Sequence, residues 1–357
     1  ISSNTALTYL EVQDNQLTSL DVSSNTALTE LVCNNNELTS LDLSSNTNLT
    51  VLECPDNQLT SLNVSNNTVL TNLTCSGNQL TSLDVSSNTA LTDLRPCNNQ
   101  LTSLDVSSNT ALTDLRPSNN QLTSLDVSSN TALITLQCSG NPLSSLDVSS
   151  NTALTHLGCY YTQLTSLDVS NNTALTYLQA KDNHLTSLDV SSNPSLTSLE
   201  CNNNQLIYLN MKNGLTEQVT DFNATSNSLT CIETLDPDYA TANWTYANDN
   251  IDDGVTFADI CYASNPSYTY VPDNNFEQHL INHGYDDVLD DYVLTQNISN
   301  VDGLGIEILG IADLTGIEDF IALENLTAYG NQLTTVDLSN NTALKFLAIS
   351  DNQLTSL

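Results

Sequence analysis

The sequence predicts a β-rich solenoid, in which short parallel strands stack coil on coil into a right-handed superhelix. The first observation is a strict period, because one column of leucines recurs every 21 residues with no insertion or deletion. These leucines are Leu20, Leu41, Leu62, Leu83, Leu104, Leu125, Leu146, Leu167, Leu188 and Leu209. The second is a short apolar–x–apolar segment in each half of the period, and the third is the asparagine that closes it. Such a period is the signature of a solenoid, whose repeats bury their apolar faces only against their neighbours.

Each coil has two halves built on the same LxxLx(V/L/C)xxN pattern. The first half reads Leu-Thr-Ser-Leu-Asp-Val-Ser-Ser-Asn, as in 101–109, and the second reads Leu-Thr-x-Leu-x-Cys-x-x-Asn, as in 70–78. Alternation of apolar and outward-facing residues is typical of a strand, so a short strand is predicted in each half. The closing asparagine stands where the chain must turn, and we expect its buried amide to satisfy backbone groups in coil after coil.

This pattern resembles the leucine-rich repeat, LxxLxLxxNxL. It is most similar to the 21-residue, cysteine-containing repeat of internalin-J-like bacterial surface proteins, a repeat also common in secreted proteins of marine Bacteroidetes. The resemblance covers nearly the whole chain. It implies a leucine-rich-repeat superhelix with a cysteine ladder and capping segments, and a recognition scaffold, a fold that serves many ligands.

The chain divides into five predicted segments. Residues 1–229 form an array of coils, 230–263 its C-terminal cap, 264–268 a linker, 269–297 a helical N-terminal cap, and 298–357 the start of a second array. Both caps resemble those of the Bacteroidetes proteins. For the first cap, the resemblance implies that Trp244 is the lid over the open core end and that Cys231 and Cys261 form a disulfide staple.

The second cap begins with Val-Pro-Asp-Asn-Asn-Phe-Glu, which predicts a helix. Asn274 and Glu277 have the spacing of a capping box, and Gly284 is expected to end the helix. His279 and His283 are four residues apart on it and could ligate a metal. No third ligand is evident, so solvated histidines are the favoured interpretation.

Six of the nine cysteines share one repeat column. They are Cys33, Cys54, Cys75, Cys138, Cys159 and Cys201. Other coils place Val12, Pro96, Pro117 or Ala180 there, so the column is a small buried apolar site, and we expect a ladder of reduced thiols. Metal binding is the alternative, although no histidine or carboxylate shares the column. Cys97 is one place off the column and is expected to point outward as a free thiol. Cys231 and Cys261 lie outside the array and are the natural disulfide pair.

Charge excludes several classes of partner. The 357 residues contain 5 Lys and Arg against 41 Asp and Glu, a net charge of −36. Nucleic acid is excluded because its binding needs basic residues, and anionic membrane surfaces are disfavoured for the same reason. No apolar run is long enough for membrane insertion. Only 13% of residues are charged, so the surface is mostly Ser, Thr, Asn and Gln. This composition suits an extracellular or cell-surface protein.

The two ends suggest that the sequence is a fragment of a longer protein. It starts and stops inside repeats, and its last residues, NQLTSL, joined to its first, ISSNTALTYL, would continue the repeat with one residue missing. We therefore expect a module of a longer tandem or head-to-tail array.

The outward positions of the second half-coil vary between coils, whereas those of the first half-coil stay Ser, Asp and Ser. A constant frame that carries variable side chains is typical of a recognition surface, and neutral drift on a solvated face is the alternative. One group on two adjacent coils offers rings, hydrogen bonds and a cation for a sugar or a peptide. Its members are His156, Tyr160, Tyr161, Tyr177, Lys181 and His184. Arg95 and Arg116 stack beside Asp93 and Asp114, either as an anchor for an acidic partner or, the favoured interpretation, as a self-neutralised ladder.

The constant half-coil carries a column of aspartates, whose mutual repulsion must be offset by hydrogen bonds, by partial protonation or by cations. Calcium is possible, with Asp84, Asp105, Asp126 and Asp147 as weak candidate ligands, and loosely held counterions are the default. Threonine columns raise an ice-binding hypothesis, but Thr18 and Ser19 are adjacent and point to different faces. No nucleophile elbow, H-E-x-x-H or phosphate loop is present, so no enzyme and no cofactor are expected.

We therefore expect a secreted or cell-surface recognition or adhesion module that binds a protein or glycan on another surface. The alternative is a structural module of an extracellular fibre that self-associates end to end.

Overall fold

The computed structural model describes residues 1–261 and 268–355, which divide into two units, Ile1–Asp259 and Ile260–Leu357. Most of the predicted linker lies outside the described residues, and Tyr268 already belongs to a strand. In the part of the chain that is described, no helix is long and apolar enough to cross a membrane.

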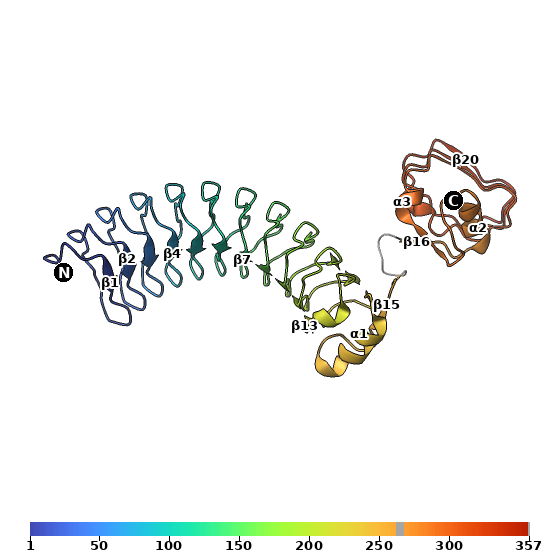
Figure 1. The fold of residues 1–357 in the computed structure, drawn as a ribbon. Coiled ribbons are helices and arrows are strands. Elements are labelled where there is room, and N and C mark those ends of the chain that lie inside the picture. Colours follow the sequence, from blue (N-terminus) through green and yellow to red (C-terminus); the bar gives the residue numbers. More distant parts are fainter. Residues whose placement is uncertain (262–267, 356–357) are drawn as a thin grey trace. The chain divides into compact units, whose positions relative to one another are not determined.

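The first unit is built on an eleven-stranded parallel sheet, with one short strand per coil (Figure 1). The strands are β1 (Tyr9–Glu11), β2 (Glu30–Val32), β3 (Val51–Glu53), β4 (Asn72–Thr74), β5 (Asp93–Arg95), β6 (Asp114–Leu115), β7 (Thr135–Gln137), β8 (His156–Gly158), β9 (Tyr177–Gln179), β11 (Ser198–Glu200) and β13 (Asp221–Asn223). Each residue pairs with the equivalent residue of the next coil, as Leu157 does with Leu178. The predicted parallel solenoid is therefore confirmed.

The prediction of a strand in both halves of every coil is wrong for most coils. In the first half-coil, strands form only near the end of the array, within a four-stranded sheet. Its members are β10 (Ser187–Asp189), β12 (Tyr208–Asn210), β14 (Cys231–Glu233) and β15 (Thr256–Ala258). The backbone N–H two residues after the aspartate donates to its side chain in both kinds of coil, at 2.9 Å for Ser107 and Asp105 and at 2.8 Å for Ser191 and Asp189, so this local bond does not by itself exclude a strand.

This difference between the two halves accounts for the curvature of the first unit. Hydrogen-bonded strands are held about 4.8 Å apart, whereas the half-coils without a ladder are free to spread. A stack that is tighter on one side bends towards that side, and the first unit is an arc of coils (Figure 1).

The core of the first unit is one continuous column of leucine, valine and cysteine side chains. The six cysteines of the repeat column are buried free thiols, which confirms the predicted ladder. Burial raises the pKa of each, to about 12 at Cys33, Cys75, Cys138 and Cys201. Cys97 is a free thiol, as predicted, and it is half-buried because its thiol donates to Ser76 Oγ at 3.0 Å.

The buried asparagines connect neighbouring coils. In the first half-coil the amide of Asn109 donates to Val85 O at 3.0 Å and to Asn88 O at 2.8 Å in the preceding coils. In the second half-coil Asn120 donates in the same way and also accepts the N–H of Leu101 at 2.9 Å. This confirms the prediction that the buried asparagine amides satisfy backbone groups, since they donate to turn carbonyls that no strand ladder reaches.

A cap closes the first core. It contains the turn η1 (Thr216–Gln218), the helix α1 (Pro237–Asn243) and the turn η2 (Tyr246–Asn248). Trp244 is 5% exposed, and its ring lies 4.6 Å from that of Phe222 and 5.9 Å from that of Phe257. It packs on the last apolar layer, as expected of a lid. Cys231 and Cys261 are disulfide-bonded.

The second unit has its own cap and core. Its elements are β16 (Tyr268–Tyr270), α2 (Asn274–Asn282), β17 (Tyr292–Leu294), α3 (Thr295–Ile298), β18 (Gly303–Gly305), η4 (Ile317–Asp319), β19 (Asn325–Thr327) and β20 (Phe346–Ala348). Strands β16 and β17 form an antiparallel pair, and β18, β19 and β20 form a parallel sheet. The ring of Phe276 from α2 stacks on that of Phe320 from the array.

The predicted capping box of α2 is wrong. The N-cap is Asp273, whose Oδ1 accepts the N–H groups of Asn275 and Phe276 at 2.9 and 3.1 Å. Glu277 is fully buried and accepts the N–H of Asp290 instead of turning back to the helix start. Gly284 follows the C-cap with φ of +77°, a conformation that favours glycine, so the predicted helix end holds.

Candidate recognition site

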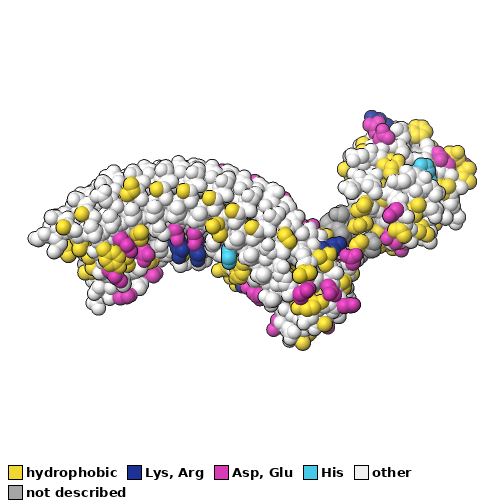
Figure 2. Space-filling view, in the orientation of Figure 1, with side chains coloured by type: hydrophobic (Ala, Val, Ile, Leu, Met, Phe, Trp, Pro, Cys, Tyr) yellow, Lys and Arg dark blue, Asp and Glu magenta, His cyan; other side chains and the backbone are white. Residues whose placement is uncertain are grey.

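The variable face consists of the outward side chains of the eleven-stranded sheet. In each of these strands the middle residue is buried, whereas most of its neighbours on either side stay accessible, as in the intermediate–buried–intermediate pattern of β5. The strand register aligns the two predicted columns coil by coil, so that Asp93, Asp114, Thr135, His156 and Tyr177 succeed one another. In Figure 2 much of the visible surface of the first unit is uncharged, and charged side chains gather along its concave edge.

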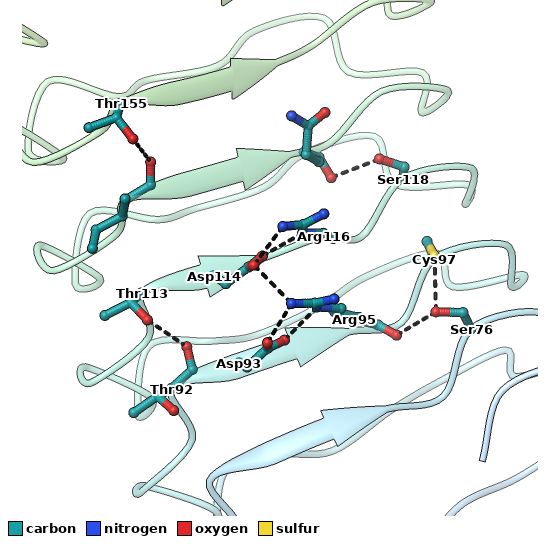
Figure 3. Close-up of polar contacts among 12 residues, drawn as sticks. Ser76, Thr92, Asp93, Arg95, Cys97, Thr113, Asp114, Arg116, Ser118 and Thr155 are labelled. Atoms are coloured by element: carbon teal, nitrogen blue, oxygen red, sulfur yellow. Dashed lines mark hydrogen bonds and ion pairs between the residues drawn. The ribbon is translucent and has the colours of Figure 1, made fainter. Parts of the chain in front are cut away.

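The two arginines form a closed ion-pair ladder with the aspartates (Figure 3). Arg95 donates to both carboxylate oxygens of Asp93 at 2.8 and 2.7 Å and reaches Asp114 in the next coil at 3.2 Å. Arg116 donates to both oxygens of Asp114 at 2.7 Å, and this bond raises the pKa of the guanidinium. Both cations are therefore neutralised within the protein, which favours the self-neutralised ladder over a free anchor.

The predicted ring-bearing residues meet in two neighbouring coils. The His156 and Tyr177 rings, on the paired strands β8 and β9, lie 5.8 Å apart. Tyr160 and Tyr161 stand edge to face at 5.7 Å, and the Lys181 ammonium lies 5.5 Å from the centre of the Tyr160 ring. We call these five residues the aromatic cluster.

Lys181 is fixed at the side of the cluster by Glu200. Its Nζ donates to Glu200 Oε2 at 2.5 Å, and this hydrogen bond raises the pKa of the ammonium, which stays charged. Burial, followed by the negative charge of Glu200, raises the pKa of Tyr177. Sequence reasoning did not select Glu200. The signal was present, however, because the Lys181–Glu200 pair spans 19 residues, the same diagonal as Arg95–Asp114.

Tyr161 occupies a backbone position where other coils use small or turn-forming residues. Its φ is +52°, and the equivalent residues with positive φ include Asn119, Gly140 and Asp182. A left-handed conformation costs an ordinary side chain about 1–2 kcal/mol. The Tyr161 side chain is nevertheless 63% exposed, so burial offsets little of that cost.

The next residue is also an exception to the repeat. Thr162 replaces the buried asparagine of the second half-coil, and its hydroxyl bonds with Cys159 O at 3.0 Å and Asn183 Oδ1 at 2.5 Å. The coil that carries Tyr160 and Tyr161 has thus lost one regular ladder asparagine. Its irregular residues coincide with the aromatic cluster.

His184 does not join the cluster. It is exposed, and its Nδ1 lies 3.3 Å from Gln205 Nε2 in the next coil. Among the described residues no ring or hydrogen-bond contact links it to the other five. Its place in the repeat, directly after the buried Asn183, puts it beyond the strand face.

The aspartate column is stabilised by local hydrogen bonds. Oδ1 of Asp84 accepts both the hydroxyl and the N–H of Ser86, at 2.7 and 2.9 Å, and these bonds lower the pKa of the carboxyl. The pKa of Asp105, Asp126 and Asp147 is lowered by the same contacts. The carboxylates therefore stay ionised, which argues against partial protonation. Within residues 1–261 and 268–355, no three His, Cys, Asp or Glu side chains are grouped as a metal site.

The threonine hydroxyls that precede the strands are used inside the protein. Thr113 Oγ1 donates to the carbonyl of Thr92 in the preceding coil at 3.1 Å, and Thr176 donates to Thr155 O at 3.0 Å (Figure 3 shows the first pair). An O–H committed to the backbone is not available to order water. This geometry argues against the ice-binding hypothesis for this column.

His279 and His283 lie side by side on α2, with ring centres 4.1 Å apart. Burial, followed by the proximity of His283, lowers the pKa of His279. His283 Nδ1 is 2.8 Å from the carbonyl oxygen of His279 and so serves as a donor to the helix end. These contacts favour a capping role over a metal site.

Comparison with known proteins gives the fold. A leucine-rich-repeat family model matches residues 181–199. The functional domain of InlJ from Listeria monocytogenes, which includes a cysteine ladder, is 31% identical with a TM-score of 0.62, and the match covers 100% of this chain and 66% of that one. A leucine-rich-repeat protein of Leptospira interrogans is 19% identical (TM-score 0.56, 99% and 93% covered). The plant peptide hormone receptor RGFR1 in complex with RGF2 is 16% identical (TM-score 0.53, 99% and 52% covered). No curated protein matches the chain.

The chain therefore has the leucine-rich-repeat fold that its repeats predict. The resemblance to cysteine-containing bacterial repeats is confirmed by the likeness to InlJ, of whose chain it spans 66%. The Bacteroidetes type stays a prediction.

Proposed function

We propose that the chain is a recognition module of a secreted or cell-surface protein and that it binds a protein or glycan partner, in adhesion, through the aromatic cluster. The observation that carries this proposal is Tyr161, an exposed ring held in a left-handed backbone conformation. Backbone strain that is not offset by burial of the side chain is typical of functional sites. The coincidence with Tyr160, Thr162 and Lys181 places several departures from the repeat in one spot.

The electrostatics of the face favour a partner that is recognised by rings and hydrogen bonds. The only cations on the variable face are Arg95, Arg116 and Lys181, and each is paired with a carboxylate. An anionic partner would have to displace those carboxylates. Tyrosine faces and hydroxyls instead suit sugar rings or apolar and polar peptide groups, and tyrosine is enriched at binding hot spots.

The test is a binding screen of the purified chain against glycans and extracellular proteins. A partner found there is measured again with Tyr177→Ala and with Tyr160→Ser. Tyr9→Ala is the matched control, because Tyr9 is an exposed tyrosine on the same face at β1. We expect at least a tenfold loss of affinity in the cluster variants and none in the control, since hot-spot truncations cost about 2 kcal/mol or more. Equal affinity in all three variants would place the site elsewhere.

The alternative, a structural module that associates end to end, is separated by light scattering of the same samples. Growth of the apparent mass with concentration, unaffected by Tyr177→Ala, would favour the fibre module.

A further inference from the structure

We propose that the loop between α2 and β17 of the second unit binds a divalent cation of the calcium class, held between the carboxylates of Glu277 and Asp286. This inference is independent of the proposed recognition function. It concerns the cap of the second unit and not the aspartate column of the first.

Glu277 is the first support. It lies on α2 with 0% exposure, and its Oε1 accepts the N–H of Asp290 at 2.7 Å. Its second oxygen, Oε2, is buried and has no hydrogen-bond partner among the described residues. A buried carboxylate oxygen without a hydrogen bond of good geometry is costly, because it has lost its water.

Asp286 provides the second support from the facing loop. The residue is half-buried, and its Oδ2 is likewise buried without a hydrogen-bond partner among the described residues. Burial, followed by the nearby charges of Asp286 and Asp290, raises the pKa of Glu277, and burial with Asp290 and Asp287 raises that of Asp286. Four carboxyl groups thus lie close together, and the backbone N–H groups of Asp290 and Asp291 at Glu277, and of Asp287 and Val288 at Asp286, offset only part of the penalty, since both pKa values stay raised. A cation between them would remove both penalties.

The surroundings fit a calcium-like ion. A cavity of about 520 Å³ opens on the loop and is lined by Asp286, Asp287 and Asp290, so a hydrated ion can reach the Asp286 side of the proposed site. Calcium takes six to eight oxygen ligands, including backbone carbonyls and water, at about 2.3–2.6 Å. No group of three acidic or histidine side chains is assembled among the described residues. The proposed ligand set is therefore two carboxylates completed by loop carbonyls and water, and the absence of sulfur or imidazole disfavours zinc.

The experiment is calorimetric unfolding of the whole chain in millimolar calcium and in chelator. A ligand at a hundred times its Kd raises the melting temperature of a unit of this size by on the order of 10 °C. We expect that shift in the transition of the second unit. Terbium luminescence sensitised by the neighbouring Tyr285, displaced by calcium, gives a second readout that does not depend on stability.

The variants locate the ion. Glu277→Gln keeps an acceptor for Asp290 N–H and removes the charge, so it should unfold in chelator at or above the wild-type temperature and lose the calcium shift. Asp286→Asn should behave alike. Asp337→Asn is the matched control, since it is an exposed acid of the same unit whose Oδ1 accepts Ser339 N–H, and it should keep the whole shift. No calcium shift in the wild type, or an equal shift in Glu277→Gln, would overturn the proposal.

Discussion

Replacing Tyr161 by asparagine should stabilise the first unit while it weakens partner binding. The φ of +52° costs tyrosine about 1–2 kcal/mol, and asparagine, which adopts this conformation readily, avoids most of that cost. The substitution also removes the edge-to-face contact with Tyr160, worth about 0.5 kcal/mol for rings that are largely in solvent. The strain exceeds the contact, so we expect a net gain of about 1 kcal/mol.

The assay is urea unfolding of the wild type and the variant, monitored by the fluorescence of Trp244, the only tryptophan of the chain. At an unchanged m-value, the midpoint should rise by the stability gain divided by m. Tyr160→Ser is the matched control. It removes the same ring contact at a residue that is not among those with positive φ, and Ser118 and Ser139 occupy the equivalent position in earlier coils, so it should gain nothing.

A midpoint for Tyr161→Asn at or below that of the wild type would show that the left-handed turn stores no strain at this residue. Backbone strain would then no longer indicate a functional origin of Tyr161, even if the ring contributes to binding.

Three further predictions concern the frame. Among the free thiols, Cys97 alone should react with iodoacetamide at neutral pH in the native protein, and peptide mapping should find the buried six labelled only in denaturant, because burial raises their pKa. The free energy of unfolding should fall as the pH drops below about 4. The pKa of Asp105 and its equivalents is lowered by hydrogen bonds from serine, so protonating these carboxylates weakens bonds that stabilise the folded state. Asp105→Asn keeps the acceptor oxygen and should retain the turn. Asn109→Ala should cost about 1–3 kcal/mol in urea unfolding, because it removes two hydrogen bonds of a buried amide, whereas the carbonyls of Val85 and Asn88 keep the N–H groups of Asn88 and Leu91 as donors.

The repeat period predicted most of the fold because every coil buries its apolar side chains against its neighbours in the same way. Apolar spacing fixed which side chains enter the core, and the tolerance of the cysteine column for Val12 or Ala180 indicated a small buried site. The two variable columns were aligned correctly for the same reason. Residues that are 21 positions apart in the sequence lie side by side on neighbouring strands, as Asp93 and Asp114 do.

The errors concern features that the repeat period does not determine. The pattern Leu-Asp-Val has strand periodicity, yet it forms a strand at Ser187–Asp189 and none at Asp105, although both aspartates accept the N–H of the serine two residues on. At α2, Asp273 and Asn274 are both good caps, and the spacing to Glu277 favoured the wrong one because it could not show that Glu277 is buried. Cys97 was expected to point outward because it is one place off the cysteine column, and its partial burial depends on Ser76 of another coil, to which its thiol donates.

In a repetitive sequence, equivalent positions of different coils can be compared, and the positions that depart from the repeat indicate the candidate site. Most coils carry the same residue at a given position because it suits the fold. A different residue that lowers stability at such a position therefore needs a cause other than folding. Tyr161 at a left-handed turn is such a departure, and Thr162, which stands in place of an asparagine, is its neighbour in the same coil. Arg95 and Arg116 depart from the repeat as well, but their charges are neutralised by ion pairs with Asp93 and Asp114 within the protein. Composition alone would rank the arginines first as an anchor, whereas the combination of strain and exposure ranks the tyrosines above them.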